Sequence, residues 1–108
     1  MKIGNLFAIF AITVCTVAPA GAYDGLDQDY ATCTQGQGKV DADQVVQACT
    51  RLIDNSAKEN ELVGIFYAMR ATASTDKKSN CRDARKILEL VKDPTFVSGA
   101  KTLIEVNC

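Results

Sequence analysis

Residues 41–56, DADQVVQACTRLIDNS, predict a helix and place a cysteine inside it. Apolar residues recur there at three- and four-residue spacing, the period of one helix face, and they are Val45, Ala48, Cys49, Leu52 and Ile53. Asp41 followed by Gln44 resembles a capping box, and Asn55-Ser56 ends the pattern. We therefore expect a helix over residues 42–54, with Cys49 facing the core and with Arg51 and Asp54 facing water.

The same helical period continues toward the C-terminus. Acidic residues around Asn60 favour the start of a second helix, whose apolar face carries Leu62, Ile65, Phe66, Met69 and Ala73. Gly64 marks either a weak point in that helix or a place where another helix comes close. This region should be a single amphipathic helix.

Two further helices are expected beyond the polar stretch 74–80. Ser79 or Asn80 can cap a helix over residues 81–92, and Pro94 suits the first turn of a last helix that runs nearly to Cys108. Upstream, residues 26–34 can form a short helix that ends at Gly36 and Gly38. Because no segment after residue 22 alternates with a period of two, the predicted fold class is all-α.

The first 22 residues have the three parts of a secretory signal peptide. Lys2 gives a basic start, residues 3–17 are mostly apolar, and Ala20 and Ala22 supply small side chains for cleavage after Ala22. The apolar run is too short for a spanning helix, so no membrane association is expected after cleavage. The predicted organisation is a signal peptide at 1–22, an N-terminal arm with a short helix at 23–40, and a helical domain at 41–108.

Four cysteines remain once the signal is removed, and an exported chain of this length predicts that they form two disulfides; they are Cys33, Cys49, Cys81 and Cys108. The chain has no histidine and no CxxC pair, so a zinc site is not expected. Short connections favour antiparallel neighbours. If the last two helices are antiparallel, Cys81 lies beside Cys108, and Cys33 is left for Cys49. The two other pairings stay open at this stage.

Charge argues against nucleic acid as a partner. After removal of the signal, 11 basic residues face 13 acidic ones, and the basic residues are interleaved with acidic ones. No long positive stripe is therefore present to neutralise a phosphate backbone.

The helical segments resemble a known repeat family. Ala48 to Leu52 align with Ala84 to Leu88 at an offset of 36 residues, close to the tetratricopeptide period of about 34. ACTRLI at 48–53, followed by a polar loop and FYAMRA at 66–71, is similar to the paired helices of exported bacterial tetratricopeptide-like proteins. About two repeats fit, within residues 44–105. The short connections between helices predict two antiparallel helical hairpins. The resemblance implies a concave surface that binds a protein or peptide without catalysis.

A second resemblance is to small periplasmic immunity proteins of the Rap/Tai type. Those proteins are all-helical with four cysteines, and Cys81, Asp93-Pro94 and terminal Cys108 are similar to their layout. This likeness implies inhibition of a secreted cell-wall amidase toxin.

Catalysis is the third hypothesis and depends on carboxylates, because histidine is absent. Asp24, Asp27 and Asp29 cluster near the mature N-terminus, and Glu59 and Glu61 flank a helix start. Acidic residues at helix starts are expected for capping alone, and no calcium-loop register is present. We therefore predict no catalytic, metal or cofactor site, and a periplasmic or secreted protein that binds another protein or peptide.

Overall fold

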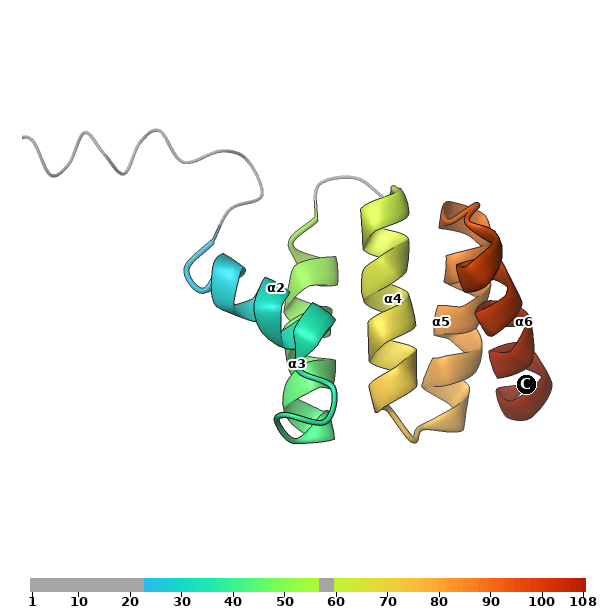
Figure 1. Ribbon diagram of the computed structural model, residues 1–108, viewed down its shortest axis with the longest axis horizontal. Coiled ribbons are helices and arrows are strands. Elements are labelled where there is room, and N and C mark those ends of the chain that lie inside the picture. The colour runs from blue at the N-terminus through green and yellow to red at the C-terminus, as the bar shows by residue number, and fades with distance from the viewer. Residues whose placement is uncertain (1–22, 57–59) are drawn as a thin grey trace, which may run out of the picture.

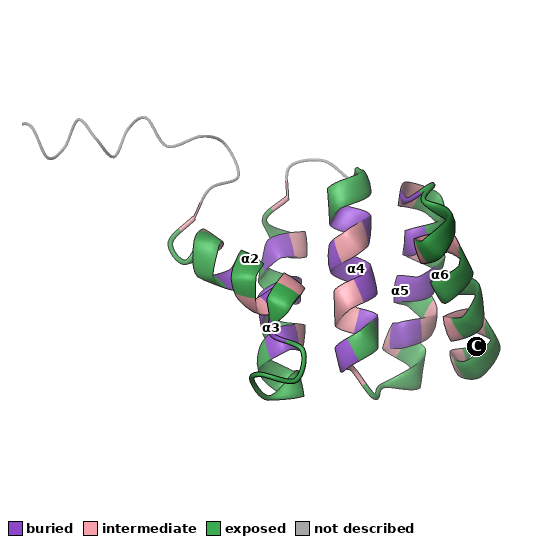
Figure 2. Ribbon diagram, in the orientation of Figure 1, coloured by how far each residue is buried: buried purple, intermediate pink, exposed green. Residues whose placement is uncertain are grey.

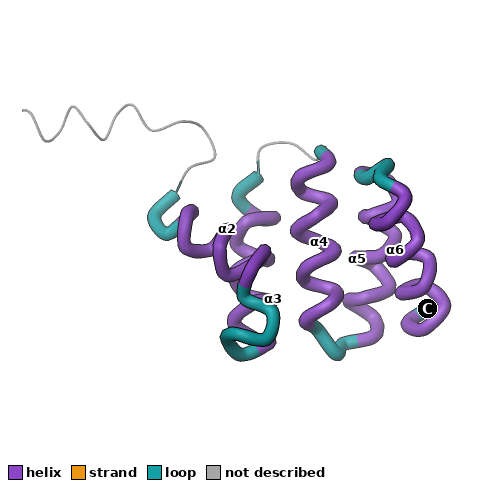
Figure 3. Tube along the Cα trace, in the orientation of Figure 1, coloured by secondary structure: helices purple, strands orange, loops and turns teal. Residues whose placement is uncertain are grey.

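The computed structural model describes residues 23–56 and 60–108, so the predicted signal peptide and Glu59 lie outside the described residues. Five helices form there: α2 (Leu26–Gln35), α3 (Ala42–Asp54), α4 (Glu61–Ala73), α5 (Lys77–Leu90) and α6 (Pro94–Asn107). No strand occurs among the described residues (Figure 3), and the all-α prediction is confirmed.

The helices stand in a row in the order of the sequence. Figure 1 shows α3, α4 and α5 side by side, with α2 crossing α3 at one end and α6 beside α5 at the other. Helix α4 contacts all four other helices, whereas α3 and α5 do not contact each other within the described part of the chain. Helix α4 is therefore the centre of the fold.

The core consists of two clusters that share α4. One cluster joins α2, α3 and α4 through residues that include Cys33, Cys49 and Phe66. The other joins α4, α5 and α6 through residues that include Tyr67, Ile87 and Ala100. The helices in the middle of the row are more buried than the last one. Helices α3, α4 and α5 each bury several residues, whereas α6 buries only Ala100 (Figure 2).

Three helix starts show why the sequence folds locally as it does. The bounds predicted for α3 are confirmed, and the Asp41 amide donates to Oε1 of Gln44 at 3.2 Å, as in the predicted capping box. The Asn60 side chain accepts from the Val63 amide at the start of α4. Asp93 accepts from the Thr95 amide, and Pro94 occupies the first turn of α6.

The prediction of a helix over 81–92 was wrong at its start. Helix α5 begins four residues earlier, at Lys77, because Asp76 accepts from the Lys78 amide and provides the cap in place of Ser79 or Asn80. Asn80 lies inside the first turns, is buried, and donates through Nδ2 to the carbonyl of Ser74. The first turn of α5 contains no apolar residue, so the apolar spacing in the sequence marked the helix only from Cys81 onward.

The apolar face predicted for α4 was also incomplete. Leu62 is 46% exposed, while Val63, Tyr67 and Ala71 are buried. The cause is the position of α4 between α3 and α5, which buries two opposite sides of it. At Gly64 the prediction of a close approach is confirmed, because a Cβ there would overlap the side chain of Val91 and lie 3.0 Å from Cβ of Leu90.

Candidate functional site

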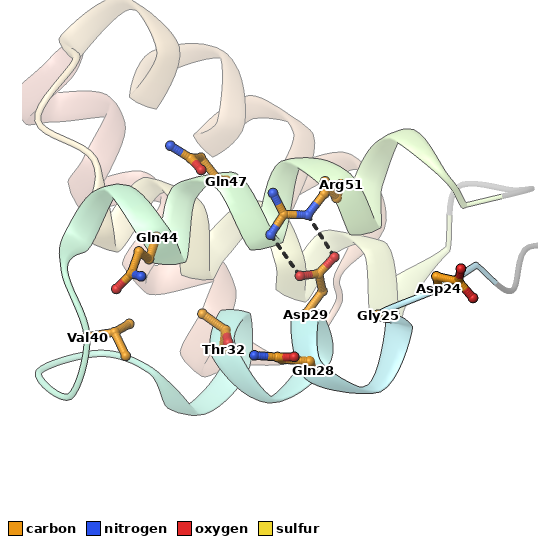
Figure 4. Close-up of a pocket in the computed structure, with 9 residues that line it drawn as sticks. All are labelled: Asp24, Gly25, Gln28, Asp29, Thr32, Val40, Gln44, Gln47 and Arg51. Carbon is orange, nitrogen blue, oxygen red and sulfur yellow. Dashed lines mark hydrogen bonds and ion pairs between the residues drawn. The ribbon is translucent and has the colours of Figure 1, made fainter.

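A polar groove of about 390 Å³ lies between α2 and α3 (Figure 4). Helix α2 and the turn before it supply one wall, and α3 with the preceding Val40 supplies the other. Nine residues line it: Asp24, Gly25, Gln28, Asp29, Thr32, Val40, Gln44, Gln47 and Arg51. Because the lining is mostly amide, hydroxyl and charged groups, the groove is suited to hydrogen bonding.

The groove has a rigid frame because a buried disulfide joins its two walls. Cys33 of α2 is bonded to Cys49 of α3, and neither residue is exposed to solvent. The second disulfide joins Cys81 at the start of α5 to Cys108 at the end of α6. Both pairs match the pairing that antiparallel packing predicted. Cys49 is therefore a crosslink in the core, and no cysteine within the described residues is left as a free thiol.

An ion pair also fixes the two walls of the groove. Arg51 donates from Nε to Oδ2 of Asp29 at 2.9 Å and from Nη2 to Oδ1 at 2.8 Å. The Tyr23 hydroxyl donates to Oδ2 of the same carboxylate at 2.8 Å. Asp29 is only 7% exposed, and a buried charge is costly unless it is paired. Its hydrogen bonds to Arg51 and Tyr23 supply the partners that compensate for this burial.

These contacts hold Asp29 in its ionised form. The hydrogen bonds from Arg51 lower the pKa of the Asp29 carboxyl, and the hydroxyl of Tyr23 lowers it further against the effect of burial. Burial, together with the hydrogen bond to Asp29, raises the pKa of Tyr23 to about 12. A general acid would need the opposite shift at the carboxyl. Asp29 is thus arranged as a structural charge.

Several groups in the groove remain open to a ligand. Across the described residues, the side chains of Gln28 and Gln47 make no hydrogen bond to another part of the chain, and both are exposed. Gln44 uses its oxygen at the helix cap. A primary amide is both a donor and an acceptor, so these side chains offer both kinds of bond to a ligand.

A second polar cluster is internal and joins three helices. Arg70 of α4 donates from Nε and Nη2 to the two carboxylate oxygens of Asp83 of α5, at 2.8 and 2.7 Å. Its Nη1 donates to Oγ1 of Thr50 of α3 at 3.0 Å, and its guanidinium lies 5.4 Å from the ring centroid of Tyr67. With 3% of the Asp83 side chain exposed, this cluster aligns α3, α4 and α5 and is closed to ligands.

The acidic residues singled out in the sequence do not converge. Asp24 and Asp29 line the groove, but Asp27 lines a separate hollow beside it. Glu61, on another helix, accepts weakly from the Lys92 amide at 3.4 Å. Within the described ranges no three histidine, cysteine or acidic residues lie together as a metal site would require.

Sequence reasoning missed Arg51 as a site residue. We expected Arg51 to face water, and its side chain is 52% exposed. The same side chain also forms the ion pair with Asp29. The only available signal was the presence of opposite charges 22 residues apart, and many other pairs in the chain share it.

None of the described helices combines the length and the apolar character needed to cross a membrane. No family model, no curated protein and no solved structure matches this chain.

Proposed function

We propose that this chain is an exported, disulfide-linked helical module that binds a protein or peptide partner through the groove between α2 and α3. The observation that carries the proposal is a groove with fixed walls and free hydrogen-bonding side chains. The buried disulfide and the ion pair already hold its shape, so little conformational entropy is lost when a ligand binds.

Export is supported by the two disulfides, which indicate an oxidising compartment. The signal-peptide pattern of residues 1–22 narrows this compartment to the periplasm or the cell exterior. The proposed tetratricopeptide-like character is supported by helices that pack mainly on their sequence neighbours, as in helical repeats.

Binding is favoured over catalysis by the state of the groove's carboxylates. An enzyme of this kind would need a carboxyl with a raised pKa near the substrate, whereas the pKa of Asp29 is lowered and its oxygens are occupied by Arg51 and Tyr23. Asp24 is the other carboxylate of the groove and lies at its end in Figure 4. Asp29, which is paired with Arg51 and Tyr23, and Asp24, which is exposed to solvent, do not form an acid–base pair.

The test is partner capture with a blocked groove. Purified oxidised protein is immobilised, exposed to the exported fraction of its source cells under non-reducing conditions, and compared with Gln47→Trp, which fills the groove. Gln35→Trp, on an exposed α2 position outside the groove, is the matched control. We expect a partner that binds directly, once purified, to the wild type and to the control but at least tenfold more weakly to Gln47→Trp.

Equal binding to all three proteins would refute the groove as the site. The identity of the partner also decides between classes, because a cell-wall amidase that loses activity on binding would establish the inhibitor hypothesis. Turnover of a captured molecule by the wild type would overturn the proposal in favour of an enzyme.

A further inference from the structure

The groove lining also indicates which chemical class of ligand it takes. We propose that the groove binds an extended peptide segment without acidic residues, and that the side-chain amides of Gln28 and Gln47 read its backbone. This inference rests on the proposed function, because it specifies the ligand of the same groove.

Spacing is the first support. Gln44, Gln47 and Arg51 follow one another along the groove side of α3 (Figure 4). At about 1.5 Å of rise per residue, these positions span about 10 Å of helix. An extended peptide covers the same length with about three residues, at about 3.3 Å each. Gln28 and Thr32, one helical turn apart, supply the opposite wall.

Chemical complementarity is the second support. Each peptide unit has one N–H donor and one carbonyl acceptor, and a free glutamine amide provides the matching acceptor and donor. Gln28 of α2 and Gln47 of α3 both line the groove, and neither side chain has an internal partner among the described residues. A peptide backbone that lies in the groove can therefore bond to side chains of both helices.

Charge excludes an anionic ligand. Residues 23–56 carry six acidic and two basic side chains, so the region around the groove is negative. The guanidinium of Arg51 is already paired with Asp29, which leaves the carboxylate of Asp24 as the uncompensated charge of the lining. A phosphate or an acidic peptide would be repelled.

The lining favours a peptide over a glycan. None of the nine residues of the groove is aromatic, so the site lacks a ring on which a sugar face could pack. Tyr23 lines the neighbouring hollow and is fixed by its hydrogen bond to Asp29.

The test begins with a random heptapeptide library panned against the oxidised wild-type protein. Enriched peptides are synthesised, and their Kd is measured for the wild type, for the double variant Gln28→Ala/Gln47→Ala, and for Gln35→Ala as an exposed amide outside the groove. We expect sequences depleted of aspartate and glutamate. Their binding should weaken at least tenfold in the double variant and less than twofold in Gln35→Ala.

A separate measurement tests whether the groove forms hydrogen bonds to the backbone of the peptide. The same peptide with N-methylated central amides loses donors while it keeps its side chains, and we expect its affinity for the wild type to fall at least tenfold. Unchanged binding of the methylated peptide, or of the double variant, would overturn the inference. A trimer of N-acetylglucosamine is the glycan probe, and its binding in place of peptides would overturn it as well.

The outcomes separate this inference from the proposed function. If Gln47→Trp abolishes partner binding while the alanine variants and N-methylation have no effect, the groove remains the site and the ligand class is wrong. If enriched peptides bind Gln47→Trp as well as the wild type, they bind outside the groove and this inference is overturned, whereas the proposed function fails only if the captured partner itself binds Gln47→Trp unchanged.

Discussion

The two ends of the molecule are joined by the same kind of bond in different surroundings. At the N-terminal end, Cys33 and Cys49 are completely buried and belong to the first core cluster. At the C-terminal end, Cys81 is partly exposed and Cys108 is exposed at the last position of the chain. The first disulfide fills core volume as well as linking two helices, whereas the second mainly links the ends of two helices.

The largest difference is expected when each disulfide is replaced by a pair of alanines. Loop entropy alone predicts a loss of about 3 kcal/mol for the separation of 16 residues and about 3.5 kcal/mol for that of 27. Burial predicts the reverse order, because Cys33→Ala/Cys49→Ala also removes two sulfur atoms from the core. We expect that variant to lose about 4 to 5 kcal/mol in the free energy of unfolding, measured with urea.

The variant Cys81→Ala/Cys108→Ala is the matched comparison. We expect this variant to lose about 3.5 kcal/mol in the free energy of unfolding, the value that loop entropy alone predicts. A larger loss than in the N-terminal variant would show that core volume is not what distinguishes the two bonds.

The next effect concerns the ion pairs. Asp83→Ala leaves Arg70, whose side chain is only 18% exposed, without its carboxylate, and we expect a loss of about 3 kcal/mol in the free energy of unfolding. Asp29→Ala should cost less, because Arg51 is about half exposed and water can solvate it. Equal losses in urea denaturation would contradict the assignment of Arg70 and Asp83 as the internal pair.

Reduction should distinguish the two disulfides kinetically. A thiol reductant reaches Cys108 in the folded protein, whereas Cys33 and Cys49 become accessible only after α2 separates from α3. We expect Cys81–Cys108 to be reduced at least tenfold faster, which corresponds to about 1.4 kcal/mol in the barrier. Quenching with an alkylating agent and peptide mass spectrometry give both rates in one sample.

The smallest effect is a pH dependence of the N-terminal end. The folded pKa of Asp29 is lower than its unfolded value, so its contribution to stability is present above about pH 4 and is lost as the pH falls further. The wild type should therefore lose more stability than Asp29→Asn between pH 5 and about pH 2. Parallel pH profiles of the urea midpoint would contradict the role of the Arg51 contact.

The sequence predicted most of the fold because its signals are local. Helix α3 is marked by the spacing of Val45 to Leu52 and by its cap, and the cysteine pairing follows from the antiparallel arrangement of α5 and α6. The start of α5 was missed because Asp76, Ser79 and Asn80 are all competent caps, and only packing shows that Asn80 is buried.

The groove could not be predicted in the same way. It exists because α2 crosses α3 so that Gln28 and Gln47 line one groove, and no periodicity encodes the angle between two helices. Asp29 likewise looked like a helix-start acid, the commonest role for that position. Its burial depends on Tyr23 and Arg51, which come from different segments.

The row of helices also has a consequence for the order of folding. Every large interface joins helices that are consecutive in the chain, with α4 shared between the two core clusters. Contacts between neighbouring segments close short loops, so the helices should assemble within milliseconds. Oxidation of the thiols takes seconds to hours and is then the slow step of maturation. Cys33 and Cys49 should therefore be brought together by packing before an oxidant joins them.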